Sequence, residues 1–450
     1  MPSRNRHILS WLGSLSWTGL GLAILFIFTD PLCANPSGGT VVAGSATISG
    51  QGTHLVTVNQ STTNSIINWN SFSINSGELT RFVLPSSNSA VLDRVTGLNP
   101  SAIFGSLQSN GRVYLINPNG ILVGPGGTIN TAGFLGSTLD VDNQSFLNGG
   151  DLHFTGTSTA SVVNLGSISV TGGDLFLLAQ QVDNEGNLSA PNGTVGMAGG
   201  TDVWIRSSGD ERVLVQPSSG AGTVRNGLAA TVQATQAEIQ AAGGNEFALA
   251  INNAGVIQAT GVNRSGGHIY LTANSGSINN SGVINASATG AGGNGGTVSI
   301  KAMEGQLTNT ATGQVLAVNG PGGKGGSIET SGHEVSLSGK IEAGVGGNWL
   351  IDPVDLRIDS SAATTIDGAL NAGTNVTEQT TASGSSGAGT VNSSGNGDII
   401  LAAALSWSTT ASLTLDAYRN IIINAPISID GGFLNPVSYT HLTLPTIYSV

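Results

Sequence analysis

The chain has 450 residues, of which 67 are glycine, and charged residues make up only 9% of it. Hydrophobic residues reach 39%, which is enough to bury a core and argues against a disordered polar chain. The formal net charge is −12 with only 14 Lys and Arg, and this excludes an extended basic surface of the kind that binds nucleic acid.

Residues 1–34 have the pattern of a secretory signal peptide. Arg4 and Arg6 form a positive n-region, and a long apolar run follows them. Ala34 is the expected last residue before cleavage, shortly after a helix-breaking proline. A retained membrane anchor and lipid attachment at Cys33 remain as alternatives. With cleavage after Ala34 the mature chain contains no cysteine, so it would gain no disulfide stabilisation.

Short β-strands are predicted from residue 39 to residue 84. Runs rich in Val, Ile and Thr alternate there with Gly, Asn and Ser. Trp69 and Phe72 are large aromatic residues within these runs, and we expect them to fill the interior of the first coils.

Residues 112–124 read RVYLINPNGILVG and hold two apolar runs separated by Asn-Pro-Asn-Gly. Pro118 has no N–H to donate to a strand ladder, and its ring fixes φ near about −65°. Asn119 and Gly120 tolerate positive φ, so the three residues predict a tight turn. The unit is therefore a strand, a turn and a second strand.

The stretch LDRVTGLNPSAIFGSLQSNGRVYLINPNGILVGPGGTINTAG, at 92–133, resembles the secretion-domain signature of the two-partner secretion exoproteins, the filamentous-haemagglutinin-like adhesins. The similarity includes IINWNSFSINSGELTRFVLP, at 66–85. It implies a secretion domain over residues 35–160 that is bound by an outer-membrane transporter barrel with POTRA domains. It also implies export through the periplasm, to the exterior or the cell surface of a Gram-negative bacterium.

In this family, Asn-Pro motifs mark the secretion domain. Carried over position by position, the main motif falls on Asn117, Pro118, Asn119, Gly120 and Ile121. A second motif falls on Asn99 and Pro100, where Ser-Ala follows in place of Asn-Leu. These residues either contact the transporter or only hold the fold, and the sequence leaves both interpretations open.

Residues 161–350 carry an internal repeat. The last four copies of a Gly-x-aliphatic element begin at Gly255, Gly282, Gly313 and Gly339, with spacings of 27, 31 and 26 residues. A period in this range indicates a solenoid or a propeller. Strands of about three to five residues, Gly and Asn corners and a variable repeat length favour the solenoid. We predict an all-β fold, a right-handed parallel β-helix with capping strands at its N-terminus and a repeat passenger over 161–350.

Alternation along each strand separates interior from exterior positions of the coils. The positions expected inside are Ile257, Ile269, Leu271, Ile278, Ile284, Val298 and Ile300. Corner asparagines are expected to stack as amide ladders that satisfy one another from coil to coil. They are Asn252, Asn253, Asn279, Asn280 and Asn309.

Further β-rich, adhesin-like repeats are predicted over residues 351–434. They begin within GGNWLIDPVDLRID, which resembles a segment that separates repeat regions in large filamentous adhesins. Residues 360–396 are rich in Ser, Thr and Gly and are expected to be looped. Residues 435–450 contain no glycine and no repeat, so we interpret them as a non-native tail, with a genuine final strand as the alternative.

No cluster in the sequence indicates a metal ion or a cofactor. In GPGGKGGS a glycine follows the lysine, where a phosphate-binding loop needs Ser or Thr. A polysaccharide-cleaving β-helix enzyme is the catalytic alternative, and it would need paired carboxylates or cationic side chains. The candidates lie in DVWIRSSGDERVLV, which we interpret as a solvated loop, and they are Asp202, Arg206, Asp210, Glu211 and Arg212.

The resemblance implies a secreted exoprotein rather than an enzyme, whose β-helix attaches to a ligand on a host or bacterial surface. The N-terminal part of a contact-dependent toxin or haemolysin, exported in the same way, is the alternative. A chain with little charge and no cysteine meets little resistance to threading. Because each coil contacts only its neighbours, folding can propagate as the chain emerges.

Overall fold

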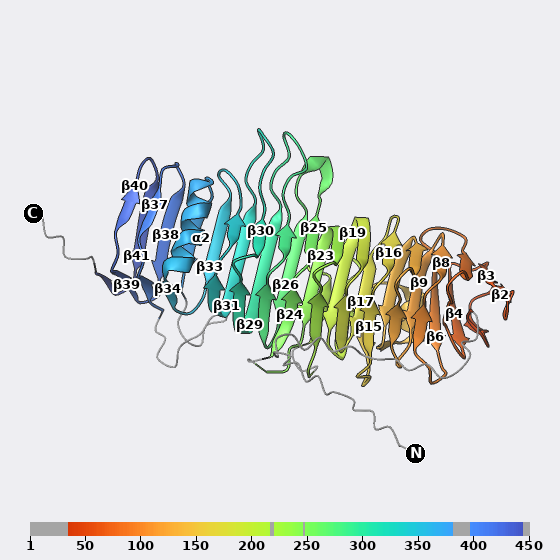
Figure 1. The fold of residues 1–450 in the computed structure, drawn as a ribbon. Helices are drawn as coiled ribbons and strands as arrows, with labels where there is room; N and C mark the ends of the chain where they lie inside the picture. Colours follow the sequence, from red (N-terminus) through yellow and green to blue (C-terminus); the bar gives the residue numbers. More distant parts are fainter. Residues whose placement is uncertain (1–34, 217–219, 246–247, 381–396, 444–450) are drawn as a thin grey trace, which may run out of the picture. The chain divides into compact units, whose positions relative to one another are not determined.

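Most strands of this computed structural model pair in parallel with the strands of the coil before and the coil after. The structure describes residues 35–216, 220–245, 248–380 and 397–443, so the expected signal peptide and its cleavage site at Ala34 lie outside the described residues. Each central coil contributes one strand to each of three sheets, whose strands follow one another in chain order (Figure 1). This arrangement confirms the predicted parallel β-helix.

The strands divide among the three sheets as follows. Sheet 1 contains β4 (Asn64–Trp69), β6 (Ala90–Val95), β9 (Arg112–Ile116), β12 (Gly133–Ser137), β17 (Leu175–Ala179), β26 (His268–Ala273), β33 (Asn348–Asp352), β35 (Asn375–Gln379), β38 (Ser412–Ala417) and β41 (Phe433–Ser438). Sheet 2 contains β7 (Ser101–Ile103), β10 (Ile121–Val123), β15 (Ser161–Asn164), β18 (Gln181–Asn184), β22 (Thr223–Asn226), β24 (Leu249–Asn253) and β27 (Ser277–Asn280). Sheet 3 contains β3 (Leu55–Gln60), β5 (Leu79–Val83), β8 (Ser106–Ser109), β11 (Thr128–Thr131), β16 (Ser167–Val170), β25 (Val256–Ala259), β28 (Val283–Asn285), β30 (Gln314–Leu316) and β32 (Lys340–Glu342).

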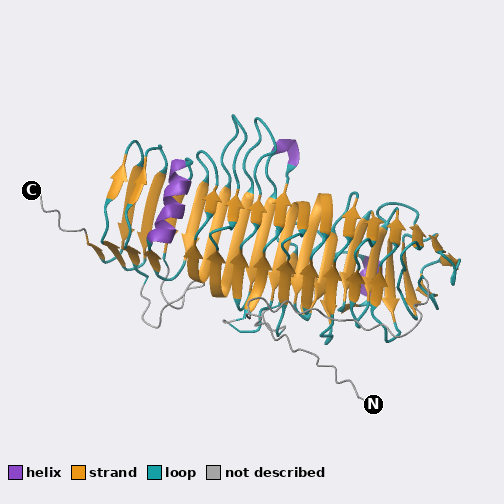
Figure 2. Cartoon of the chain, viewed as in Figure 1, coloured by secondary structure: helices purple, strands orange, loops and turns teal. Residues whose placement is uncertain are grey.

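Four longer strands bend around a corner and belong to two sheets each. Sheets 3 and 1 share β19 (Asn187–Gly199) and β23 (Thr231–Ala241). Sheets 1 and 2 share β29 (Thr297–Asn309) and β31 (Ser327–Leu337). The loops that follow β25, β28 and β30 extend beyond the strands and include the short helix η1 (Val262–Arg264) (Figure 2). The glycine-rich runs at 290–296 and 320–327 lie in two of these loops.

The first coil is covered by two antiparallel strands. Strand β1 (Thr40–Ala43) pairs with β4, and β2 (Ala46–Ser49) pairs with β3. They cover the first parallel strands, which would otherwise present unpaired N–H and C=O groups. The predicted capping strands are confirmed.

The interior of the coils is apolar and continuous. All seven aliphatic positions expected inside between residues 257 and 300 are buried and belong to a single hydrophobic cluster. Trp69 and Phe72 are buried in the same cluster, with their ring centroids 5.7 Å apart and edge to face. The predictions from alternation are therefore confirmed.

A ladder of six buried asparagine amides runs along one corner of the coils. In each step the Nδ2 of one asparagine donates to the Oδ1 of the next at 2.7–2.9 Å, through Asn164, Asn184, Asn226, Asn253, Asn280 and Asn309. Asn309 ends the ladder by donating to the carbonyl oxygens of Gly313 and Ser338. The predicted ladder is confirmed for Asn253, Asn280 and Asn309. Asn252 and Asn279 instead form a separate, half-buried pair, joined at 3.0 Å.

A small antiparallel sheet covers the outer face of sheet 1. It contains β13 (Asp140–Val141), β14 (Leu152–Thr155), β20 (Asp202–Ile205) and β21 (Val213–Val215), and the short helix α1 (Asn143–Asn148) lies beside it. We call these five elements the flap. Phe146, Phe154 and Val203 of the flap share a second hydrophobic cluster with Leu135 and Phe176 of sheet 1. Sheet 1 is therefore buried on both faces beneath the flap.

A helix interrupts sheet 3, and the expectation of a loop is wrong over α2 (Ser360–Asn371). Asp359 caps the helix by accepting hydrogen bonds from the N–H groups of Ser361 and Ala362. The buried apolar residues recur at helical spacing and are Ala362, Ala363, Ile366, Ala369 and Leu370. Residues 381–396 of the expected loop lie outside the described residues.

Two further parallel sheets belong to the last coils. One contains β34 (Leu356–Ile358), β36 (Ile399–Leu401), β39 (Asn420–Ile423) and β42 (His441–Thr443), and the other contains β37 (Leu405–Trp407) and β40 (Ile427–Ile429). Residues 433–443 pair as β41 and β42, whose residues are largely exposed. The foreign origin of residues 435–450 stays a prediction. Among the described residues, neither α2 nor any other helix combines the length and apolar character needed to cross a membrane.

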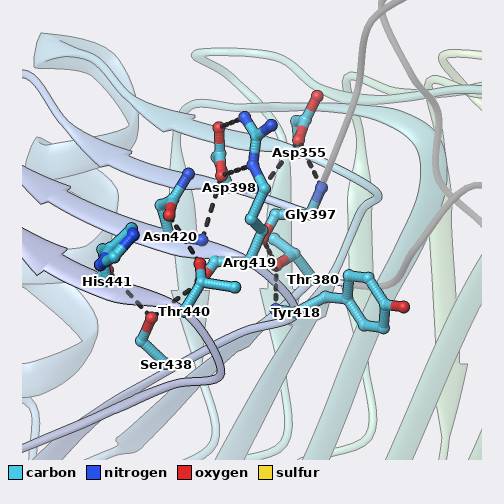
Figure 3. Close-up of polar contacts among 10 residues, drawn as sticks. All are labelled: Asp355, Thr380, Gly397, Asp398, Tyr418, Arg419, Asn420, Ser438, Thr440 and His441. Atoms are coloured by element: carbon cyan, nitrogen blue, oxygen red, sulfur yellow. Dashed lines mark hydrogen bonds and ion pairs between the residues drawn. The ribbon is translucent and has the colours of Figure 1, made fainter.

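Polar side chains join these last coils on one side (Figure 3). Asp398 accepts hydrogen bonds from the guanidinium of Arg419 and from the N–H of Asn420. The Arg419 hydrogen bond lowers the pKa of Asp398. Asp355 accepts from the N–H groups of Gly397 and Asp398, both at 2.9 Å. Three successive coils are thereby connected through carboxylates.

Glu378 is a fully buried carboxyl that faces the interior of the last coils. It lies between Ile351 and Leu415 in the register of sheet 1, and neither carboxylate oxygen has a hydrogen-bond partner among the described residues. Burial raises the pKa of Glu378 from 4.5 to about 8. The side chain is therefore neutral in the folded protein at neutral pH.

We predict that Asn253→Ala destabilises the fold by about 2–3 kcal/mol, because the Nδ2 of Asn226 and the Oδ1 of Asn280 both lose their partner while buried. Denaturant unfolding followed by circular dichroism measures the change. Asn252→Ala is the matched control, since that neighbouring side chain is only half-buried and accepts one bond. Equal effects of the two substitutions would contradict a structural role for the ladder.

We predict that Glu378→Leu stabilises the fold, and more so at alkaline pH. The folded-state pKa lies above the ordinary value, so the wild-type chain loses stability as the pH rises from 4.5 through about 8. Leucine has no proton to lose and matches its neighbours Ile351 and Leu415. Denaturant unfolding should show a gain on the order of 3 kcal/mol at about pH 8 and a smaller gain at about pH 5.

The control for this change is Glu304→Leu, at an exposed position of β29. It should not reproduce the gain in stability expected of Glu378→Leu. A gain from Glu378→Leu that is the same at both pH values would mean that the buried carboxyl does not titrate with folding.

Candidate functional site

The Asn-Pro motifs occupy one corner of two consecutive coils, between sheet 1 and sheet 2. Asn99 and Pro100 connect β6 to β7, and residues 117–120 connect β9 to β10. Parallel pairing of Ile121 with Ser101 places the two turns side by side. All seven residues expected from the sequence therefore lie together. The name Asn-Pro corner is used below for residues 97–100 and 117–121.

Asn117 uses its whole side chain to hold this corner. It is fully buried, and its Nδ2 donates to the carbonyl oxygen of Asn99 and to the Oγ of Ser101, both at 3.0 Å. Its Oδ1 accepts from the backbone N–H and the Nδ2 of Asn119, at 2.9 and 3.2 Å. No polar atom of the Asn117 side chain is left for a partner, which favours the fold-holding interpretation for this residue.

The turn itself is made by local contacts. Gly120 N–H donates to the carbonyl oxygen of Asn117 at 3.0 Å, and Asn119 N–H donates to the Asn117 side chain. Gly120 has φ +112°, a conformation that side chains with a Cβ rarely adopt. These bonds span two or three residues and close the turn locally, while the Nδ2 of Asn119 joins it to the previous coil by donating to the carbonyl oxygen of Gly97 at 2.9 Å.

The outer surface of the corner is apolar and exposed. Leu98 is 90% exposed, and Asn99 and Pro118 are also exposed. Leu98 was missed in the sequence, where the signal was a single leucine within the turn sequence Gly-Leu-Asn-Pro. The corner therefore presents two exposed apolar side chains, Leu98 and Pro118, on its outer surface.

The LDRV segment, residues 92–95, lies directly before the corner, and its first three side chains point into three different environments. Leu92 points outward into the cluster beneath the flap. Asp93 points inward, where its Oδ1 accepts from the indole N–H of Trp69 at 2.8 Å, and burial raises its pKa to about 8. Arg94 binds the carboxylate of Asp140 at 2.8 Å and so fastens the flap to β6, the strand that leads into the corner.

Of the charged candidates for catalysis, Arg206 and Arg212 line a common cavity, whereas Asp202, Asp210 and Glu211 do not line it. Asp202 contacts His153 at 2.8 Å. Arg212 pairs with Asp174 at 2.8 Å, and the intervening Asp210 and Glu211 are exposed in the loop between β20 and β21. The strands on either side of this loop, β20 and β21, are partly buried. The expectation of a solvated loop therefore holds for the residues between them and not for the whole stretch. No group of three or more His, Cys, Asp or Glu side chains that could hold a metal ion occurs in the described ranges.

The sequence model of the family described as the TPS secretion domain matches residues 33–286, which is more than half of the chain. A heme/hemopexin-binding protein of Haemophilus influenzae is 31% identical over 275 residues, covering 58% of this chain and 30% of that protein. Another protein of the same name from H. influenzae is 38% identical over 104 residues, covering 23% of this chain and 11% of that protein. This chain thus spans less than a third of the length of these curated relatives.

The fold also has a counterpart among solved structures. The crystal structure of the HMW1 secretion domain from H. influenzae aligns with a TM-score of 0.57 at 23% identity, covering 88% of this chain and 100% of that one. The match shows that the two chains share a β-helix fold.

We predict that Asn117→Ala lowers the free energy of unfolding by about 2–4 kcal/mol, because it leaves the carbonyl oxygen of Asn99 and the amide of Asn119 without their buried partner. Thermal and denaturant unfolding measure the change. Asn99→Ala is the matched control, since the contact of Asn99 is made by its backbone carbonyl and its side chain is exposed. Two variants of equal stability would show that the Asn117 side chain does not hold the corner.

Proposed function

Because the chain belongs to the two-partner secretion family through its TPS secretion domain, we propose that its N-terminal coils are an export address. A POTRA-bearing outer-membrane transporter of a Gram-negative bacterium binds them from the periplasm, and the coils that follow are carried outward. The family match begins at residue 33, directly before the expected cleavage site, and extends past residue 160. Neither the family nor the curated relatives are enzymes, so the polysaccharide-cleaving alternative is set aside.

The observation that carries this proposal is the Asn-Pro corner. Its turn closes through bonds between near neighbours in sequence, and the side chains of Asn117 and Asn119 join it to the previous coil. Leu98 of the earlier coil and Pro118 of the later one then offer a partner an exposed apolar surface. A signal of this kind needs only two stacked coils, so it can form before the rest of the passenger folds.

The rest of the chain suits passage through a membrane. Residues 34–450 contain no cysteine, so no disulfide would have to form or break during transit. Parallel pairing joins each coil only to its neighbours, so coils can be added one at a time on the outer side. Folding outside then opposes backward movement of the chain.

For the passenger we propose attachment to a ligand on a host or bacterial surface. The stack of coils with loops on one side supports this role, because the loops can vary without disturbing the strands. The N-terminal part of a toxin or haemolysin remains the alternative. Capture of a soluble host ligand is a second candidate, favoured by the 31% identity with a heme/hemopexin-binding protein.

We predict that Leu98→Ser reduces secretion severalfold without changing stability, because the exposed side chain supports recognition and not packing. Secretion is measured as the fraction of the chain in the medium when it is produced together with its transporter, and stability by unfolding of the purified chain. Leu228→Ser is the matched control, since Leu228 is 83% exposed in a corner of a later coil. If Leu98→Ser is secreted at the wild-type level, Leu98 is not part of the export signal.

A further inference from the structure

A cavity of about 270 Å³ lies between the flap and the outer face of sheet 1. Its floor is formed by β6, β9, β12 and β17, and its cover by α1, β14 and the loop after β20. Gly133 lies in the floor, where a Cβ would come within 3.2 Å of the Cγ of Arg112 and 3.4 Å of the carbonyl oxygen of Asp174. The absence of a side chain at this position helps to keep the space open.

Three arginine residues line this cavity, although the whole chain carries only 14 Lys and Arg and a net charge of −12. Arg112 projects from β9, while Arg206 and Arg212 come from the loop between β20 and β21. Asp174 neutralises one of them, since its Oδ2 contacts the Nη1 of Arg212 at 2.8 Å. The Oδ1 of Asp174 accepts a hydrogen bond from the N–H of Thr194 at 2.9 Å.

The two other arginines have no carboxylate bound to them among the described residues. Arg112 contacts only the side-chain amide of Asn88, at 3.3 Å. Arg206 lies near Asp151, whose Oδ1 already accepts from the N–H and Oγ of Ser207 at 2.8 and 3.0 Å. The lining of the cavity is therefore positive, with two guanidinium groups available to a ligand.

Aromatic side chains provide apolar walls beside this charge. Tyr114 and Phe146 meet edge to face with ring centroids 5.3 Å apart, and Phe176 lies beneath the guanidinium of Arg212. The hydroxyl of Tyr114 makes no hydrogen bond within the described residues. Burial raises the pKa of Tyr114 above its ordinary value, so the hydroxyl stays protonated and can donate.

We propose that this cavity binds a small organic anion. Arg112 and Arg206 bind its carboxylate or phosphate group, and its ring or apolar body packs against the wall formed by Tyr114 and Phe146. A guanidinium group presents two parallel donors, which match the paired oxygens of a carboxylate or a phosphate. The volume of about 270 Å³ suits a molecule of the size of one sugar ring.

The test is isothermal titration of the purified folded chain with glucuronate, glycerol 3-phosphate and glucose. We expect one or both anions to bind with a Kd in the millimolar range or tighter, and glucose not to bind at about 10 mM. Added salt should weaken anion binding, because part of the attraction is screened. Tighter binding of glucuronate would indicate an acidic sugar, and tighter binding of glycerol 3-phosphate would indicate a phosphorylated ligand.

Arg112→Gln should weaken anion binding about tenfold or more, because a bond between two charged groups is lost. Arg81→Gln is the matched control, since Arg81 also contacts a single side-chain amide, that of Gln108 at 3.3 Å, and is exposed on sheet 3. Tyr114→Phe keeps the ring and removes only the hydroxyl, so a severalfold loss of affinity is expected even if Arg112→Gln disturbs the fold.

Three results would overturn the proposal. The first is that neither anion binds at about 10 mM. The second is that glucose binds as tightly as glucuronate. The third is that anion binding is unchanged in both Arg112→Gln and Tyr114→Phe. These measurements use folded protein and do not involve the transporter, so they are independent of the outcome of the secretion assay.

Discussion

Parallel hydrogen bonding from coil to coil is the constraint on which this protein depends. Most of its strands have only three to six residues, and a strand of that length has no stability by itself. Each is held by the strand before and the strand after, so the register of one coil determines that of the next. The asparagine ladder from Asn164 to Asn309 adds to this constraint, because a slip of one residue would turn each amide from the interior to the surface.

Elements that are not parallel strands have to supply the hydrogen bonds that a strand would have made. The helix α2 shows how this is done where it replaces a strand of sheet 3. Asp367 accepts from the N–H of Ser406 at 2.8 Å, and Asn371 donates to the carbonyl oxygen of the same residue at 2.9 Å. Two side chains one helical turn apart thus satisfy the edge of β37. The antiparallel strands β1 and β2 do the same at the first coil with backbone groups alone.

The flap and the Asn-Pro corner are connected although they have different proposed roles. Arg94 binds Asp140 at the start of the flap, and Ser158, after its second strand, donates to the carbonyl oxygen of Pro118 at 2.6 Å. The segment that carries β13, α1 and β14 is therefore fastened at its start to β6, the strand that leads into the corner, and at its end to the corner itself.

Much of the fold could be predicted because its rules are local. The alternation of apolar residues placed Ile257 and Ile300 inside, and the repeated asparagines predicted the ladder, because each repeat places equivalent residues in equivalent positions. The turn at Asn117 was evident for a similar reason, since its bonds join near neighbours in the chain. The role of the Asn117 side chain as a bridge to the previous coil was not evident, because the sequence does not show which coil lies beside it.

The period of the residues was enough to predict the parallel strands of the coils, the turn at 117–120 and the apolar interior, because each of these repeats or closes locally. Residues 360–371 form a helix because packing against the neighbouring coils gives their helically spaced alanines a surface on which to bury, and the sequence alone does not show that surface. The charged cavity likewise depends on the tertiary structure. Arg112 and Arg206 are separated by a long stretch of chain, and they face the same space only because the flap packs its apolar side chains onto the outer face of sheet 1.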